Sequence, residues 1–379
     1  MKILFLAFAS NYTPGMDYQD NCFCESILSE GNEVVLLSNP EQYVDGILKH
    51  VGSQVYYDKG LKIIRFEYKN IISKKLSRKI RAFKNVYNVI VKENPDIIFC
   101  HGINYLPILD VVKYKKKHMN VSIYADTHAS YNNSATNWIS LNILHKIYYR
   151  SIYKKIEKYL TKFFYIGYDE KIFAKEVYRS NNEIMEFLPL GGKIPSENEY
   201  LLFRQEKRRE LNIENNVVLF VHSGKLDKMK KTTELINAFN SSNNINARLV
   251  IIGSIPEDTE KSIKKLIDVS ANVEYIGWKE NNELRKYLCA CDVYCQPGSV
   301  SATFQNAICC RCAILSYPHK TYKENYDKGN IMWASNEIEL INAINTLSNN
   351  IDMIKTMSKI SSDFSINNLD YNMLIHKFI

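Results

Sequence analysis

Two lysines and a glycine in the second half of the chain could hold an anion. The apolar run at residues 217–221 leads into Gly224 and Lys225. Lys230 follows shortly before a helix expected at residues 232–240. Lysine supplies compact positive charge to a leaving group that gains negative charge as its bond breaks. The pattern therefore predicts a diphosphate clamp, with a solvated loop as the alternative.

Residues 291–315 carry a second pattern of this kind. An apolar run ends at Gln296, Pro297 and Gly298, a loop of small hydroxyl residues follows, and residues 304–308 open an expected helix. Such an order of strand, loop and helix points free backbone N–H groups and a positive dipole end at an anion. We therefore expect a phosphate-type site here.

Two histidines follow apolar runs in the first half of the chain. His101 comes directly after residues 97–100, and Asp126 and His128 follow residues 121–125. Side chains at the carboxyl ends of strands in open sheets reach the ligand site. Both histidines are thus candidates for a substrate contact, with a structural role as the alternative. The polar loop 129–134 also fits hydrogen bonding to a ligand.

The loop after the first expected strand is a candidate acceptor contact. Gly15 permits a sharp backbone path, and Asp17 and Asp20 could accept hydrogen bonds from hydroxyl groups. Asp20 could instead cap the helix expected from about Cys22. A lone glycine is only a weak signal for dinucleotide binding, because no Gly-x-Gly-x-x-Gly pattern follows it.

Parallel sheets would position these candidates. Short apolar runs alternate with longer helical patterns, which indicates an α/β fold whose sheets are covered by helices. The expected strands are residues 3–8, 33–37, 62–66, 97–100, 121–125 and 163–166, then 217–221, 249–252, 273–276, 293–295 and 313–315.

The chain of 379 residues is long enough for two domains. We expect one domain over residues 1–195 and another over residues 196–350. Residues 189–192 and the polar stretch 193–207 predict a linker, and only helical patterns remain after Asn336. A final helix within residues 351–379 is expected to pack back toward the first domain.

Composition is that of a globular protein, with 46% hydrophobic residues. No apolar run approaches the roughly 18 residues of a membrane span. The run at residues 3–8 is short and lacks a following cleavage pattern, so we expect a first strand and a cytoplasmic protein. The nine cysteines include Cys309, Cys310 and Cys312, and the Cys-x2-Cys spacing of Cys309 and Cys312 has no second such unit to pair with. Buried free thiols are therefore favoured over a metal site.

The net charge of +8 is concentrated in the first half of the chain. Cations alternate with apolar residues at helical spacing over residues 69–92, which fits a solvated helix face or a surface that lies on anionic lipid. No recognised nucleic-acid module accompanies the charge, so nucleic acid is not an expected partner. The cations of this stretch include Lys74, Lys75, Arg78, Lys79, Arg81 and Lys84.

The order of these motifs resembles that of glycosyltransferases with the GT-B architecture. The chain is similar to the large retaining family 4, of the kind found in bacterial surface-polysaccharide gene clusters. The resemblance covers nearly the whole length and implies two Rossmann-like domains whose parallel sheets face a central cleft. It rests on the Gly15 loop, residues 126–128, 187–192 and 224–227 with Lys230, and on residues 275–278 and 290–293.

The resemblance also implies roles for individual residues. The second half would bind the donor, with Lys225 and Lys230 on its diphosphate and with Trp278 and Lys279 by its base. The first half would bind the acceptor, and His128 would contact the transferred sugar. Such enzymes need no metal or other cofactor.

One motif departs from the family pattern. Within the segment that corresponds to residues 291–315, the family usually carries two glutamates spaced as Glu-x7-Glu. Here Gln305 stands at the position of the second glutamate and Pro297 at that of the first. A glutamine can still exchange hydrogen bonds with ribose hydroxyls. Short loops of this kind also occur in inverting GT-B enzymes, so inversion is the alternative to retention. The loop residues that remain for phosphate or sugar are Gly298, Ser299, Ser301 and Thr303.

The resemblance implies transfer of a sugar from a UDP- or GDP-linked donor to a glycan or lipid-linked acceptor in surface-polysaccharide synthesis. It places the protein in the cytoplasm, peripheral on the inner face of the membrane. Two alternatives stay open: a sugar-nucleotide epimerase on the same fold, and an inactive GT-B scaffold, because the first glutamate has no counterpart.

Overall fold

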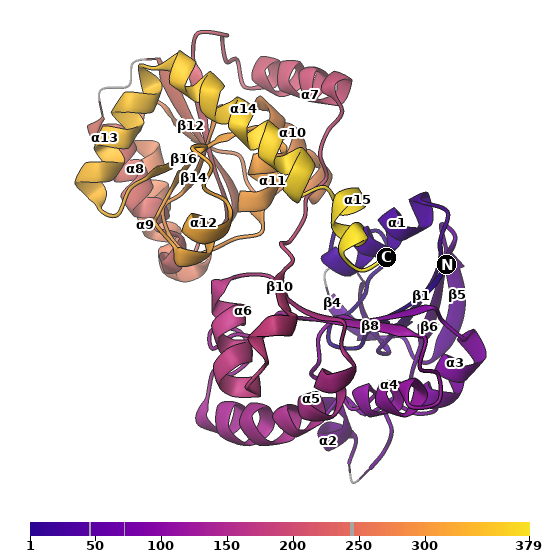
Figure 1. Ribbon diagram of the computed structural model, residues 1–379. Coiled ribbons are helices and arrows are strands. Elements are labelled where there is room, and N and C mark those ends of the chain that lie inside the picture. The colour runs from indigo at the N-terminus through magenta and orange to yellow at the C-terminus, as the bar shows by residue number, and fades with distance from the viewer. Residues whose placement is uncertain (45–46, 72, 243–245) are drawn as a thin grey trace. The chain divides into compact units, whose positions relative to one another are not determined.

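The computed structural model describes residues 1–44, 47–71, 73–242 and 246–379. The chain forms two compact units (Figure 1). Unit 1 consists of Met1–Pro189 together with Leu374–Ile379, and unit 2 consists of Leu190–Met373. Each unit is built on its own sheet and is described separately.

Unit 1 contains a sheet in the order β10-β9-β8-β7-β1-β2-β6-β5. All neighbours in it run parallel except the edge pair β5 and β6. The strands predicted for the first half are confirmed, whereas β3, β4, β5 and β10 were not predicted. The bounds are β1 Lys2–Ala7, β2 Glu33–Ser38, β5 Gln54–Asp58, β6 Leu61–Arg65, β7 Ile97–Cys100, β8 Ser122–Thr127, β9 Lys162–Tyr165 and β10 Met185–Phe187, with a separate hairpin of β3 Glu41–Val44 and β4 Ile47–His50.

Helices cover both faces of this sheet (Figure 1), which explains why its central strands are apolar throughout. Successive side chains of β1 point to opposite faces. Leu4 and Leu6 belong to the core that contains Ile90, whereas the Phe5 ring lies 6.3 Å from that of Phe23 on the other face. The helices concerned are α1 Gln19–Ser29, α3 Val86–Glu93, α4 Ile108–Lys115 and α5 Arg150–Ile156.

Unit 2 contains a second, entirely parallel sheet in the order β13-β12-β11-β14-β15-β16. The strands predicted for the second half are confirmed, and β16 is additional. The strands are β11 Val218–Lys225, β12 Ala247–Ser254, β13 Val273–Tyr275, β14 Val293–Gln296, β15 Ala313–Ser316 and β16 Ile331–Trp333. The helices are α8 Thr232–Ser241, α9 Glu257–Asp268, α10 Asn281–Ala290, α11 Thr303–Cys309, α12 Lys320–Asn325, α13 Glu337–Ser348 and α14 Ile351–Asn368.

The predicted linker at residues 193–207 is wrong, because most of it belongs to α7 Glu197–Glu210. A reciprocal capping box starts this helix: the Ser196 hydroxyl accepts from the Glu199 N–H, and the Glu199 carboxylate accepts from the Ser196 N–H. Its polar residues also anchor it, since Arg204 and Arg208 both pair with Asp292. A polar stretch was thus a helix held by ion pairs.

The basic stretch at residues 69–92 is not one helix. It forms α2 Lys74–Lys79 and then α3, with left-handed backbone at Arg81 (φ 49°) and Asn85 (φ 59°) between them. The residue Ile72 and the side chains of Lys74 and Lys75 lie outside the described part of the chain. No helix in the described ranges is both long enough and apolar enough to cross a membrane.

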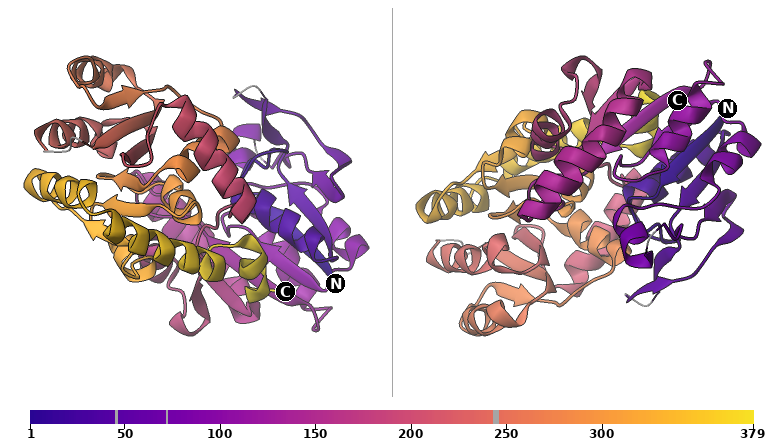
Figure 2. Two further views of the ribbon diagram at one scale, coloured as in Figure 1. Left: turned by 90° about the horizontal axis from the view of Figure 1, so that it is seen from above. Right: turned by 90° about the horizontal axis from the view of Figure 1, so that it is seen from below.

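After α14 the chain returns from unit 2 to unit 1. The helix α14 (yellow in Figures 1 and 2) packs against α11 and β15, so it belongs to unit 2. The short helix α15 Tyr371–Leu374 leads into the returning segment Leu374–Ile379. Phe378 is buried there, with its ring 5.3 Å from Phe23 and 4.6 Å from Phe99.

All nine cysteines are free and buried, which confirms the expectation of buried thiols. They pack as small apolar side chains in the cores of the two units.

Candidate functional site

Each unit has one point where its strand order reverses. In unit 1 the chain adds β2 on one side of β1 and later adds β7 on the other side. In unit 2 it adds β12 on one side of β11 and later adds β14 on the other. Ligands of open parallel sheets bind at the carboxyl ends of the strands at this switch point. Each of the two switch points is therefore a candidate ligand site.

The switch point of unit 1 contains a cavity of about 250 Å³. Its walls come from the loops that follow β1, β7 and β8 and from the turn after α2. The lining residues are Ala9, Ser10, Arg81, His101, Gly102, Ile103, Asn104, Thr127, His128, Ala129 and Ser134. The two predicted histidines are thus brought together in one wall.

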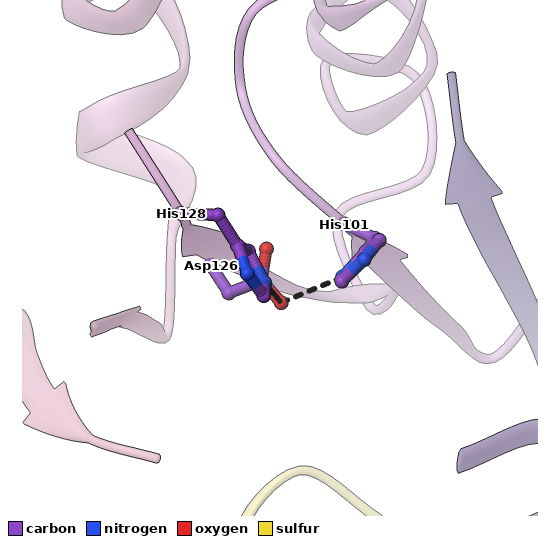
Figure 3. A group of neighbouring side chains, drawn as sticks. All are labelled: His101, Asp126 and His128. Atoms are coloured by element: carbon purple, nitrogen blue, oxygen red, sulfur yellow. Dashed lines mark hydrogen bonds and ion pairs between the residues drawn. The ribbon is translucent and has the colours of Figure 1, made fainter. Parts of the chain in front are cut away.

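A buried carboxylate lies between these histidines (Figure 3). The Asp126 Oδ2 atom lies 2.8 Å from Nδ1 of His101 and 3.3 Å from Nε2 of His128. The Oδ1 atom accepts a 2.6 Å hydrogen bond from the backbone N–H of Gly102. Asp126 is fully buried, whereas 34% of the His128 side chain is exposed. His128 is therefore the member of the group that can reach a ligand.

Charge on this group is set by the competition between burial and pairing. Burial alone would lower the pKa of His101, but the Asp126 carboxylate outweighs it and raises that pKa to about 9. Burial would raise the pKa of Asp126, yet His101 and His128 together hold it below its usual range. At neutral pH the pair is therefore an imidazolium beside a carboxylate.

Two π-helical segments hold the loop after β7. His145 lies in the π-helix Ser140–Tyr149 and Tyr178 in the π-helix Ala174–Tyr178, and their Nδ1 and hydroxyl atoms are 3.0 Å apart. The Tyr178 hydroxyl donates to Oδ1 of Asn104 at 2.8 Å. Such helices are rare and often accompany functional sites. Here they fix a loop that lines the cavity.

At the switch point of unit 2, the side chain of Lys230 joins two loops. Its Nζ donates to the carbonyl oxygens of Ser299 (3.2 Å) and Val300 (3.0 Å), so the turn after β11 is tied to the loop after β14. Lys230 is buried, and burial lowers the pKa of its ammonium group. Two of its protons are used by carbonyls, which leaves the third for an anion.

Close backbone approach explains a glycine in the same place. A Cβ atom on Gly298 would lie 2.1 Å from the carbonyl oxygen of Met229. At Gly224, by contrast, an added Cβ would meet only the Lys230 side chain, at 3.4 Å. Gly298 is thus required by packing between two loops, and Gly224 leaves room beside the lysine.

The comparisons with known proteins agree with this architecture. Residues 203–362 match the family "Glycosyl transferases group 1". No curated protein sequence matches the chain. Among solved structures, the Anabaena protein HepE in complex with UDP has a TM-score of 0.67 at 14% identity, covering 100% of this chain and 98% of that one. The chain has the GT-B fold.

Two further GT-B structures support the same conclusion. A glycosyltransferase from Rickettsia africae has a TM-score of 0.68 at 13% identity, over 99% of this chain and 96% of its own. WaaG, a glycosyltransferase involved in lipopolysaccharide biosynthesis, has a TM-score of 0.65 at 14% identity, over 99% and 98%. The predicted fold of two Rossmann-like halves is therefore confirmed.

In unit 2, the residues predicted to bind the nucleotide sugar differ in exposure. Lys225 is exposed at the end of β11, and Trp278, 66% exposed, follows β13 together with the half-buried Lys279. Gln305 is instead buried, and its amide is used inside unit 2, where it bonds to the Tyr326 hydroxyl and to the Ser301 carbonyl. A ribose contact by Gln305 would require these bonds to be exchanged.

The loop after β14 also uses N–H groups that the sequence pattern left free for an anion. The Ser299 N–H donates to the Met229 carbonyl, and the Ser301 N–H donates to the Tyr322 hydroxyl. The Thr303 N–H donates to the Ser301 hydroxyl. These three N–H groups are therefore occupied, and the ammonium of Lys230 is the hydrogen-bond donor that we expect an anion to meet at this switch point.

In unit 1, the residues predicted in the first loop divide into two groups. Gly15 is exposed with φ 78° and Asp17 is half-buried, and neither lines the cavity. Asp20 is buried and accepts a 2.7 Å hydrogen bond from the hydroxyl of Ser10, which does line it. The helix cap suggested for Asp20 is wrong, because the N-cap residue of α1 is Tyr18.

Sequence reasoning missed Ser10, Arg81 and Asn104 as cavity residues. Arg81 belonged to a basic stretch that predicted a solvated or lipid-facing surface. Its left-handed backbone is the feature that turns it toward the cavity, and no local pattern for an arginine predicts that conformation. The polar loop 129–134, which was expected to line a site, contributes Ala129 and Ser134.

Proposed function

We propose that this GT-B protein transfers a sugar from a nucleoside diphosphate sugar, UDP- or GDP-linked, to a glycan or lipid-linked acceptor of a cell-surface polysaccharide. The observation that carries the proposal is the buried ammonium of Lys230 at the switch point of unit 2. This position lies within the residues that match the glycosyltransferase family. UDP in the Anabaena structure supports a nucleotide as ligand.

In the proposed reaction the bond between the anomeric carbon and the diphosphate oxygen breaks. The acceptor oxygen bonds to the same carbon with retention of configuration, and its proton passes to an oxygen of the released diphosphate. Lys225 and Lys230 stabilise the charge that develops on this leaving group, and His128 contacts the sugar. Cations of the chain supply this stabilisation, so we propose that no metal takes part.

The roles of His128 and Lys230 are tested by sugar transfer from a panel of UDP- and GDP-sugars. His128→Ala and Lys230→Ala should each lower the rate on the order of a hundredfold. Lys228→Ala is the matched control, because Lys228 lies in the same turn but is exposed and near Asp258. Near-wild-type turnover in both test variants would sink the assignment.

Thermal unfolding with nucleotides separates a transferase from an inactive scaffold. Stabilisation by UDP or GDP together with slow hydrolysis of the sugar donor is expected for the enzyme. A chain that responds to no nucleotide is a scaffold. The proposal that no metal takes part is checked in the sugar-transfer assay, where a chelator should leave the transfer rate unchanged.

We also propose that the protein works at the inner face of the cytoplasmic membrane, where basic residues after β6 contact anionic lipid. Lys79 is exposed there, whereas Arg78 is already paired with Glu41 at 3.0 Å. Sedimentation with vesicles should show binding that needs anionic lipid and weakens in Lys79→Gln. Binding that ignores lipid charge contradicts the proposal.

A further inference from the structure

We propose that the cavity of unit 1 binds an anionic group, a phosphate or a carboxylate, carried by the acceptor, and that Arg81 is the residue that selects it. This inference rests on the proposed function, because it names the chemical class of the acceptor. Arg81 is a cation that lines this small cavity beside the two histidines.

The guanidinium of Arg81 is positioned but not neutralised. Its Nη1 donates to the carbonyl oxygen of Asn104 at 3.1 Å, and Asn104 is itself held by Tyr178. In the described ranges no carboxylate pairs with Arg81. Most of its donors therefore remain for a ligand, and their planar arrangement matches the oxygens of a phosphate or carboxylate.

The backbone of Arg81 adopts a conformation that is unusual for its residue type. Its φ is 49°, in the left-handed region. Two backbone hydrogen bonds hold this conformation. The Arg81 N–H donates to the carbonyl oxygen of Arg78, and the Leu106 N–H donates to the carbonyl oxygen of Arg81. Strain of this kind is unfavourable and persists where the surrounding structure enforces it, often at ligand sites. The turn aims the side chain into the cavity.

The rest of the wall suits an anion better than a cation. His101, Asp126 and His128 could hold a metal by spacing alone, since their ligand atoms lie within 4.8 Å of one another. However, both oxygens of Asp126 already accept hydrogen bonds, from His101 and Gly102. The Asp126 carboxylate is paired with His101 and the Asp20 carboxylate accepts from Ser10, whereas the guanidinium of Arg81 keeps donors that can meet an anion.

The size of the cavity limits the ligand. Sites for drug-sized molecules occupy roughly 300–1,000 Å³, and this cavity has about 250 Å³. It therefore fits one charged sugar unit rather than a lipid chain. Hydroxyl groups of Ser10 and Ser134 in the wall can serve the neutral part of that sugar.

The test measures binding of three probes by calorimetry: glucose 6-phosphate, glucuronate and neutral glucose. At least one anionic probe should bind the wild-type protein tenfold or more tightly than glucose, and the better of the two identifies phosphate or carboxylate as the group. Arg81→Asn should remove this preference. Asparagine is chosen because it tolerates left-handed backbone, so the turn is retained.

Arg179→Asn is the matched control, because Arg179 has the same backbone conformation (φ 55°) but is exposed and outside the cavity. It should keep the preference. Equal binding of all probes, a preference that survives in Arg81→Asn, or Zn²⁺ bound by the three side chains would each overturn the inference. UDP binding is followed in parallel: its absence alone refutes the donor proposal while leaving the anion site in place.

Discussion

At the scale of single residues, the charge state of the unit 1 cavity depends on Asp126. Its carboxylate is fully buried and accepts hydrogen bonds from both His101 and Gly102. Removing a partner from such a buried group is costly because the remaining charge is left uncompensated. His101 therefore positions the carboxylate, and only His128 is exposed enough to touch a ligand.

The His101 pair makes the stability of unit 1 depend on pH. The pKa of His101 is about 9 in the folded protein against about 6.5 unfolded. Its contribution is therefore complete below about pH 6.5 and is lost as the pH rises through 9. In urea unfolding, the advantage of the wild type over His101→Gln should shrink by about 1–3 kcal/mol between pH 6.5 and 9. A constant difference would contradict this.

Sequence reasoning found the histidines because strand ends can be predicted from apolar runs. The resemblance to the family placed Gln305 at a ribose, yet that amide is buried and bonded to Tyr326. Whether a side chain in the first turn of a helix such as α11 points outward depends on tertiary packing, which residue type and spacing do not encode. The burial of Gln305 was thus beyond the reach of the sequence.

At the scale of elements, His222 joins three parts of unit 2. Its Nδ1–H donates to the carbonyl of Cys295 in β14, and its Nε2 accepts from the hydroxyl of Thr232 at the start of α8. The bond accepted by Nε2 requires the neutral ring, because a protonated Nε2 has no lone pair to accept with. Burial lowers the pKa of His222 to about 4. The strand β11 is thereby fixed to β14 and α8 near its carboxyl end.

Acid should therefore loosen unit 2. The folded pKa of His222 lies below its unfolded value of about 6.5, so its contribution is present above pH 6.5 and is lost as the pH falls through 4. Denaturation of the wild type and of His222→Gln should show a difference that narrows by about 1–3 kcal/mol on acidification. A difference that widens toward pH 4 would refute the neutral ring.

The approach of two loops at Gly298 gives a second prediction for an element. In Gly298→Ala the new Cβ would lie 2.1 Å from the Met229 carbonyl, so the loop must move away from Lys230. We expect UDP to bind about tenfold more weakly and the fold to lose about 1–3 kcal/mol. Thermal shift with UDP measures both effects.

Val300→Ala is the control for that experiment. Val300 lies in the same loop with an exposed side chain, and only its carbonyl contacts Lys230. It should keep wild-type UDP binding. If Gly298→Ala also binds UDP normally, the tie between the two loops is not needed for the nucleotide.

Elements with regular patterns were predictable, and those held by charge were not. Central strands such as β1 and β11 contain continuous apolar runs, residues 3–7 and 218–221, because both faces are covered, so they stand out in the sequence. The helix α7 was mistaken for a linker because its anchors are Arg204 and Arg208, whose partner Asp292 is distant in sequence. Ion pairs over such separations leave no local periodicity.

At the scale of the whole molecule, the GT-B chain divides into two units, and the first unit is made of two separate stretches of the sequence. Unit 1 includes Leu374–Ile379, which follows all of unit 2 in the sequence. The contacts that hold this segment include Phe378 among aromatic rings, Lys377 on Glu186 at 2.8 Å, and His376 on Glu30 at 3.1 Å. The segment is thus an integral part of the first unit.

Phe378→Ala should destabilise unit 1 by about 3–5 kcal/mol, because a buried ring beside Phe23 and Phe99 is removed. Hydrogen exchange should increase throughout unit 1 while unit 2 keeps its protection. Met373→Ala serves as the control, since that side chain is exposed. Equal loss of protection in both units would contradict the division.

The position of Phe378 has a consequence for biosynthesis. Ribosomes make a chain from its N-terminus, and domains usually fold in that order as they emerge. Here the rings of Phe23 and Phe99 pack against Phe378, which is translated only after residues 190–373. The half that is synthesised first is therefore completed last, and during translation it exposes an apolar surface that chaperones are suited to cover.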